Sequence, residues 1–286
     1  MEAGRTHYIV HPSRTDEITI YNVADIHLGV KACDKRKLRE DVTRIKEDPS
    51  AFWFGGGDYA DYVSPTDKRW SAGEIDPEIT VADLSRLGHR QADMVLAELK
   101  PIANKCIGML LGNHEAKYVS SKEQTDLHGW LCKEMGVPNF GYCAIFDTVF
   151  IRKPAIKRPM LLRSSTGQDG SRWSIRHLAH HGFGGAVTPG GKLNTLIKAM
   201  NSFNADVYWL GHVHESKAQR LVRIGADSDC SNLTHQEQLG VITGSYLRTY
   251  HQGSCGYGET KGYAPAPLGC TGVTFKPEKG SFWSKV

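Results

Sequence analysis

The sequence predicts a layered α/β domain, and three observations lead to this prediction. Short apolar runs at residues 51–54, 106–111 and 205–210 are typical of strands that are buried on both faces. Segments at residues 34–49 and 193–200 carry apolar residues at the three- and four-residue spacing of an amphipathic helix. Strands that alternate with helices, and then give way to further strands, favour helices packed on β-sheets.

The remaining elements are placed by periodicity and by turn residues. A strand is expected at residues 17–23, an irregular insertion at 62–77 and a long helix at about 79–100 whose apolar stripe includes Leu84. Residues 142–180, 221–224 and 241–247 predict further strands and hairpins, and the Gly- and Tyr-rich residues 250–272 predict extended loops. No repeat or linker divides the chain. We therefore expect a single domain, residues 1–286, with a motif-bearing core at about 17–215 and C-terminal strands and loops at 216–286 that cover the site.

Composition and cysteine usage indicate the cellular setting. The formal charge of +4 permits an anionic partner without requiring one. The seven cysteines are odd in number and form no Cys-x-x-Cys pair, which is typical of reduced thiols. The first residues lack the apolar segment of a signal peptide, and no apolar run is long enough to span a membrane. A cytoplasmic protein with no membrane partner is expected.

Potential metal ligands follow five of the predicted strands. They are Asp25 and His27, Asp58, Asn113 and His114, His180 and His181, and His212 and His214. The pairs 25/27 and 212/214 have the two-residue spacing at which side chains leave an extended backbone on the same side. Imidazole, carboxylate and amide-oxygen ligands suit first-row divalent ions. The set is too large for one ion and fits two ions that share a bridging carboxylate.

Such a pair of ions points to phosphoryl transfer. Two metals about 3.5–4 Å apart can stabilise both the attacking and the leaving oxygen of an in-line displacement. In this chemistry a hydroxide that bridges the ions attacks phosphorus. The sequence therefore predicts a phosphoesterase.

The motifs, taken in order, carry a family resemblance. Asp-x-His at 25–27, Gly-Asp-x-x-Asp at 57–61, Gly-Asn-His-Glu at 112–115, His-Gly at 181–182 and Gly-His-x-His at 211–214 resemble the calcineurin-like metallophosphoesterases. The resemblance implies a four-layer αββα sandwich, with two mixed β-sheets flanked by helices and a dinuclear metal site at the strand ends. Residues beyond 214 carry no motif that can be transferred.

The resemblance also implies which residues bind each ion. One metal would be held by Asp25, His27, Asp58 and His214, and the other by Asp58, Asn113, His181 and His212, with Asp58 bridging. His181 is preferred to His180 because the family's ligand directly precedes glycine. Mn²⁺ is the expected metal, and Fe, Zn or Ni would also fit these ligands.

The resemblance also implies catalytic residues, and residues near the expected site are candidates for substrate binding. His114 matches the residue that assists the leaving oxygen, and Asp61 matches the carboxylate that orients it. Tyr62 stands where the protein phosphatases of this superfamily have a phosphate-gripping arginine. This difference favours the diesterase and nuclease branches. Tyr62, His180 and His251 are candidates for substrate contact.

Three hypotheses about the function remain open. The leading one is a phosphodiesterase or nuclease that acts on DNA, RNA or nucleotides, since the chain resembles phage and prophage members described as DNA-repair-exonuclease-like. The second is a phosphomonoesterase or protein phosphatase. The third, from a different class, is a non-catalytic metal-binding protein.

Overall fold

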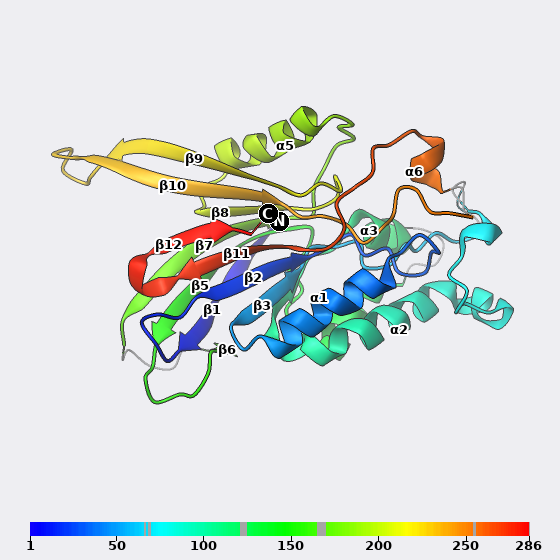
Figure 1. The fold of residues 1–286 in the computed structure, drawn as a ribbon, viewed down its shortest axis with the longest axis horizontal. Coiled ribbons are helices and arrows are strands. Elements are labelled where there is room, and N and C mark those ends of the chain that lie inside the picture. The colour runs from blue at the N-terminus through cyan, green and yellow to red at the C-terminus, as the bar shows by residue number, and fades with distance from the viewer. Residues whose placement is uncertain (66, 68–69, 121–124, 165–169, 254–255, 286) are drawn as a thin grey trace.

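A computed structural model describes the chain except for residues 66, 68–69, 121–124, 165–169, 254–255 and 286. Two β-sheets lie face to face, and helices cover the outer face of each sheet (Figure 1). This is the four-layer α/β arrangement that the family resemblance implied, and that prediction is confirmed.

Both sheets are mixed. The larger sheet has the order β6 (Met160–Leu162), β1 (Glu2–His11), β5 (Cys143–Arg152), β7 (Arg172–His180), β8 (Val207–Leu210), β10 (Leu233–Ile242), β9 (Lys217–Ala226). The smaller has the order β12 (Ser281–Ser284), β11 (Thr271–Lys276), β2 (Ile18–Val23), β3 (Ala51–Gly55), β4 (Cys106–Met109). β2, β3 and β4 are parallel, as are β7, β8 and β10, whereas β11 runs antiparallel to β2.

The helices pack on the outer faces through apolar stripes. α1 (Lys35–Glu47), α2 (Leu87–Leu99) and α4 (Leu127–Met135) bury their apolar residues with those of the smaller sheet. α5 (Pro189–Ser202) packs on the larger sheet. Two shorter helices, α3 (Asn113–Ser120) and α6 (Tyr257–Thr260), lie in the loops at one end of the sheets (Figure 1). No helix in the described part of the chain has the length and hydropathy needed to cross a bilayer.

The two-sided burial of β3 explains its unbroken apolar sequence. Phe52 and Phe54 point into the core between the sheets. Trp53 points the other way, into the helical layer, where its indole N–H donates to the Ile102 carbonyl at 2.8 Å. Because successive side chains of a strand alternate in direction, only a continuous apolar run can fill both interfaces.

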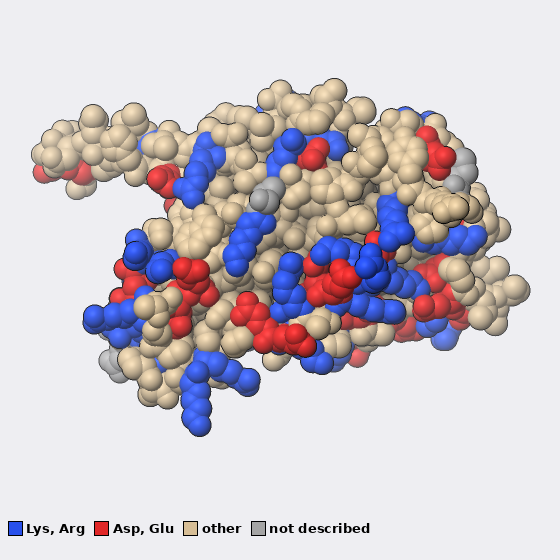
Figure 2. Space-filling view, viewed as in Figure 1, with Lys and Arg blue, Asp and Glu red and all other residues tan. Residues whose placement is uncertain are grey.

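The C-terminal part of the chain contributes to both sheets. β9 and β10 form a hairpin that projects beyond the body of the molecule (Figures 1 and 2) and exposes Val222, Ile224 and Leu233. β11 and β12 complete the smaller sheet beside β2. A short helix, α6, occupies part of residues 250–272, where the sequence predicted only extended loops.

Two further elements differ from the sequence predictions. β1 was not predicted, because its buried positions include His7 and His11, which hide the apolar alternation. The helix expected at about 79–100 is an α-helix only from Leu87 to Leu99, preceded by a 3₁₀ segment at Val81–Arg86. Leu84 lies in that segment and is exposed, so it does not belong to the apolar stripe.

A neutral histidine is buried between the sheets. The ring of His177 stacks on Phe146 at 4.7 Å, and its Nδ1 accepts a hydrogen bond from the Trp209 indole at 3.1 Å. Burial lowers the pKa of His177 to about 3. In the unfolded chain the imidazole has its ordinary pKa of about 6.5. The contribution of His177 to the free energy of unfolding is therefore fully present above pH 6.5 and is lost as the pH falls towards 3.

We predict that His177→Phe weakens this acid sensitivity. The wild-type protein should lose up to about 1.4 kcal/mol of unfolding free energy per pH unit from this group between pH 6.5 and 3. The variant should be less stable at pH 7, because the Trp209 N–H loses its acceptor, yet lose less stability on acidification. Urea unfolding at pH 7 and pH 5 measures both effects. Equal pH dependence in the two proteins would contradict this account of His177.

Candidate metal centre

The motif residues meet at one edge of the two sheets, where five strands end. β2, β3 and β4 run parallel to one another in the smaller sheet, and β7 and β8 do so in the larger sheet. The carboxyl ends of each parallel set therefore lie at the same edge of its sheet. The loops after these strands carry the expected ligands: Asp25 and His27, Asp58, Asn113, His181, and His212 and His214. The His212 backbone N–H donates to the Asp25 carboxylate at 2.9 and 3.0 Å, which joins the loops of the two sheets.

The backbone here is strained. Seven non-glycine residues in the described part of the chain have a left-handed φ, and five of them are expected ligands: Asp25 (53°), His27 (52°), Asp58 (54°), His212 (66°) and His214 (46°). This conformation costs roughly 1–2 kcal/mol per residue, and such strain concentrates at functional sites. The prediction that the side chains of the pairs 25/27 and 212/214 project from an extended backbone is therefore wrong. With these left-handed residues, Asp25 and His27 reach the same group of lone-pair atoms, whereas His212 and His214 reach two different groups.

One group of lone-pair atoms joins Asp25, His27 and His214. His214 Nε2 lies 3.4 Å from Asp25 Oδ1 and 3.3 Å from His27 Nε2. The three ligand atoms lie within 4.8 Å of one another, as a shared cation would require.

A second group joins Asp58, Asn113, His181 and His212. One terminal amide atom of Asn113 lies 2.7 Å from His212 Nδ1 and 3.1 Å from both Asp58 Oδ2 and His181 Nε2. An amide nitrogen at this position satisfies three acceptors when no cation is present. With the amide oxygen there instead, four lone-pair atoms converge, which is the donor set of a cation site.

Backbone carbonyls fix the tautomers of the two histidines in this second group. His181 Nδ1 lies 2.8 Å from the Gly56 carbonyl, and His212 Nε2 lies 3.1 Å from the Gly184 carbonyl. A carbonyl can only accept, so each of these ring nitrogens carries the proton. In the neutral form of each ring the opposite nitrogen, His181 Nε2 or His212 Nδ1, carries the lone pair directed at the cluster, so a bound cation takes the place of a second proton there.

Asp58 belongs to both halves of the site. It can share a cation with His181 and His212 on one side and with His27 and His114 on the other. Among the expected ligands it therefore has the position of a bridge.

The ionised groups of the site favour the binding of cations. Burial raises the carboxyl pKa of Asp25, but the hydrogen bond and the charge of His214 more than reverse this and lower it. Burial likewise opposes ionisation of Asp58, yet the charge of His181 holds its pKa well below the usual range. Burial lowers the pKa of His181, but the charge of Asp58 outweighs it and raises that pKa to about 9. Two ionised carboxylates thus lie in a buried site.

His114 and Asp61 lie beside this cluster. His114 Nδ1 is hydrogen-bonded to the Asp61 backbone carbonyl, and the Asp61 carboxylate lies 3.5 Å from the Nδ1 atoms of both His114 and His27. The His114 backbone N–H donates to Asp58 Oδ1 at 2.9 Å. These contacts orient the His114 ring at the edge of the site. His114 also offers a ring nitrogen within 4.8 Å of ligand atoms of His27 and Asp58.

The three candidates for substrate contact have different environments. Tyr62 is buried and packs against Tyr118 at 5.4 Å, and its hydroxyl has no hydrogen-bond partner within the described part of the chain. Substrate contact by Tyr62 stays a prediction, and only 7% of the residue is exposed. His180 is half-buried, and its Nδ1 accepts from the Gly182 N–H at 2.9 Å. His251 is half-buried in the loop before α6, and its buried Nδ1 has no partner among the described residues.

Glu115 is a supporting residue that the sequence analysis quoted only as part of a motif. Its carboxylate accepts from the backbone N–H groups of Asp58 and Gly112 at 3.0 Å and of Tyr59 at 2.8 Å. Burial, followed by the charge of Asp58, raises the pKa of Glu115 to about 7. The three hydrogen bonds to Glu115 hold the loop that carries Asp58. Its place as the last residue of Gly-Asn-His-Glu was the signal for this role.

Two glycines permit the close approach of these loops. A Cβ on Gly112 would lie 2.1 Å from the Asp58 nitrogen and 2.2 Å from Asp58 Oδ1. Gly57 has a φ of +95°, and a Cβ there would lie 2.5 Å from His181 Nδ1. Any larger residue would therefore displace a ligand or its support.

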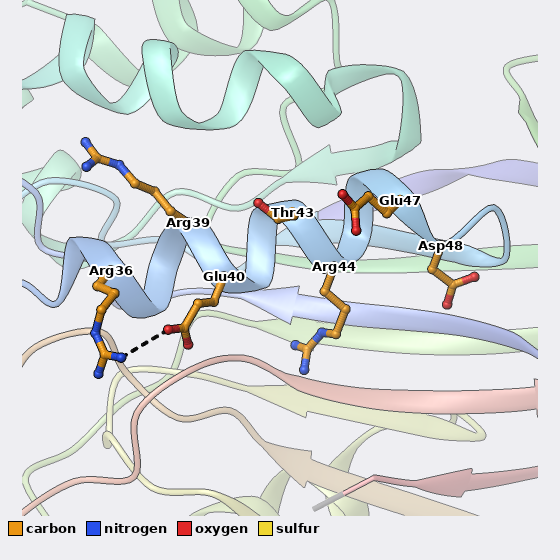
Figure 3. Close-up of a pocket in the computed structure, with 7 residues that line it drawn as sticks. All are labelled: Arg36, Arg39, Glu40, Thr43, Arg44, Glu47 and Asp48. Carbon is orange, nitrogen blue, oxygen red and sulfur yellow. Dashed lines mark hydrogen bonds and ion pairs between the residues drawn. The ribbon is translucent and has the colours of Figure 1, made fainter.

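Other surface features do not coincide with this site. A depression on α1 is lined by Arg36, Arg39, Glu40, Thr43, Arg44, Glu47 and Asp48, none of which belongs to the cluster (Figure 3). Its arginines are paired with Glu40, Glu98 and Asp41, so their charge is already compensated. Basic and acidic side chains are interspersed on the face shown in Figure 2.

The family model of the calcineurin-like phosphoesterases matches residues 18–216, more than half of the chain. The chain therefore belongs to this family, as the motifs indicated, and is a metal-dependent phosphoric ester hydrolase. Members of the family use divalent metal ions, and the two groups of lone-pair atoms fit such ions in donor type and tautomer.

Several solved structures resemble the fold at low sequence identity. A predicted phosphoesterase from Streptococcus pneumoniae TIGR4 is 10% identical, with a TM-score of 0.35 over 94% of this chain and 99% of that protein. A metallophosphoesterase from Sphaerobacter thermophilus is 11% identical, with a TM-score of 0.37 over 93% and 87%. The NAD nucleotidase of Haemophilus influenzae is 11% identical, with a TM-score of 0.40 over 96% and 50%. No curated protein matches the sequence.

We predict that Gly112→Ala weakens metal binding at least about tenfold, because the added methyl group displaces Asp58 and its support from Glu115. Isothermal titration with Mn²⁺ measures the affinity. Gly190→Ala is the matched control, since a Cβ at Gly190 meets nothing within 4 Å. Unchanged affinity in folded Gly112→Ala protein would contradict the role given to this close contact.

Proposed function

We propose that the protein is a dinuclear-metal phosphodiesterase that acts on nucleic acid or nucleotides. The observation that carries this proposal is the pair of neighbouring lone-pair groups, one at Asp25, His27 and His214 and one at Asp58, His181 and His212. Asp58 also shares a group with His27, and the hydrogen-bonded pair His114–Asp61 lies beside them. Two divalent ions bound there would act as Lewis acids on phosphate oxygens and would lower the pKa of a bound water.

In this proposal the two ions would share Asp58 and otherwise have different ligands. Asp25, His27, Asp58 and His214 would hold one ion, and Asp58, Asn113, His181 and His212 would hold the other. Mn²⁺ is the proposed metal, with Fe, Zn and Ni as alternatives, because the ligands are carboxylate, imidazole and amide oxygens without a thiolate.

His114 is proposed to deliver a proton to the leaving oxygen. Its Nδ1 proton is directed at the Asp61 carbonyl, which leaves Nε2 as the position that gains and releases a second proton. The nearby Asp61 carboxylate stabilises the ring when both nitrogens are protonated. An alkoxide leaving group from a sugar benefits from this proton more than an acidic phenol does.

The absence of a phosphate-gripping arginine at position 62 supports a diester substrate. A phosphomonoester carries up to two negative charges on its phosphate, whereas a diester carries one. The buried Tyr62 supplies no charge. Lys192, near the His214 carbonyl, is already paired with Glu215 at 3.7 Å. Because neither Tyr62 nor the paired Lys192 offers a free positive charge, these two positions suit the singly charged diester.

The wider setting is also a proposal. We propose that residues 1–286 act as one catalytic domain, since strands after residue 216 complete both sheets.

A reducing compartment such as the cytoplasm fits the cysteines, because all six in the described part of the chain are free thiols and burial raises the pKa of Cys33, Cys106, Cys132 and Cys143.

We predict that the Mn²⁺-loaded protein hydrolyses bis-p-nitrophenyl phosphate in preference to p-nitrophenyl phosphate. The diester should give the higher kcat/KM, and Asp58→Asn should be inactive on both. Preference for the monoester would favour the alternative, a phosphomonoesterase or protein phosphatase. A stable metal complex with no turnover of either ester would instead indicate a non-catalytic metal-binding protein.

His114→Asn should retain the metals and lose rate, by about 10²–10⁴-fold on an unactivated diester. The loss should be smaller for a p-nitrophenyl ester, whose leaving group needs no proton. Metal analysis by mass spectrometry, run beside the kinetics, separates the two roles of this residue. If the variant no longer binds two ions, His114 is a ligand and the proposed proton transfer is wrong.

A further inference from the structure

The loop after His181 presents an exposed aromatic side chain next to the metal cluster. Phe183 lies between Gly182 and Gly184, and both glycines contact His212. A Cβ on Gly182 would lie 2.5 Å from His212 Cβ, and the Gly184 carbonyl lies 3.1 Å from His212 Nε2. The backbone on each side of Phe183 is thus fixed against a proposed metal ligand.

Phe183 is held by other rings and is not buried in the core. It is 42% exposed, and its ring meets that of His180 at 5.2 Å and 66°. His180 in turn meets Tyr142 at 5.5 Å and 88°, and the Tyr142 hydroxyl donates to the Gly182 carbonyl at 3.1 Å. These contacts support Phe183 from one side and leave much of its surface open to a ligand.

His180 adds a directed hydrogen-bond donor to this aromatic surface. Its Nδ1 accepts from the Gly182 N–H, so the ring proton of the neutral imidazole is on Nε2. An aromatic surface beside a polar group of fixed tautomer is the chemistry that binds a nucleobase, through stacking and a hydrogen bond to its edge.

We propose that Phe183 and His180 form a subsite for an unpaired nucleobase next to the scissile phosphate. This inference rests on the proposed phosphodiesterase function and narrows its substrate to single-stranded nucleic acid or a nucleotide diester. A paired base inside a duplex is stacked on both faces, so Phe183 could reach it only after the base was flipped out.

The test compares oligo-dT with an abasic oligomer of equal length, which has the same backbone charge but no bases. Phe183→Ala should lower kcat/KM on oligo-dT about tenfold or more, mainly through KM, and leave the abasic oligomer unaffected. Phe183→Tyr should restore activity because it retains a ring. Val187→Ala is the matched control, since Val187 is an exposed apolar residue of the same loop and should behave like the wild type.

Binding gives a second measurement that does not depend on turnover. Anisotropy of fluorescein-labelled oligo-dT, measured in the slow His114→Asn background, should show the same loss with Phe183→Ala. If oligo-dT is cleaved and Phe183→Ala is as active as the wild type, the base subsite is wrong while the diesterase function stands. If no diester is cleaved but Phe183→Ala selectively weakens oligo-dT binding, the subsite stands and the proposed reaction falls. If Phe183→Ala lowers kcat/KM equally on oligo-dT and on the abasic oligomer, base stacking by Phe183 is contradicted.

Discussion

The carboxylate of Asp58 is the point on which the candidate metal centre depends. It lies 3.3 Å from His181 and accepts the backbone N–H of His114, so loops from both sheets meet at this one side chain. Its backbone is held in a left-handed conformation, which is unfavourable for any residue but glycine. The structure around it must therefore supply the stabilisation that keeps this conformation.

That stabilisation comes from hydrogen bonds to the strained loops. Glu115 accepts the N–H groups of Asp58 and Tyr59, and the Asp25 carbonyl accepts the Ser245 hydroxyl at 2.8 Å and the Tyr246 N–H at 2.9 Å. Ser245 and Tyr246 lie beyond the stretch that the family model matches. The C-terminal part of the chain thus does more than complete the sheets, because it also fixes the loop that carries Asp25 and His27.

The sequence predicted much of the fold and which residues meet at the site, but not the geometry of the site. Trp53 and its neighbours could be assigned to a buried strand because β3 is apolar on both faces. β1 was missed because buried histidines occupy positions where an apolar alternation was sought. Left-handed residues at Asp25 and His212 could not be predicted from residue type alone. Aspartate and histidine are enriched in this conformation but are also common in others. The burial of Tyr62 depends on packing against Tyr118, which sequence spacing does not reveal.

The central claim is that one carboxylate joins two metal ions. Electron paramagnetic resonance during a Mn²⁺ titration tests it most directly, because two ions that share a ligand are magnetically coupled. We expect two ions to bind per chain with a coupled spectrum, and Asp58→Asn to abolish the coupling. A single uncoupled ion at saturation, or a coupled pair that survives in Asp58→Asn, would contradict it.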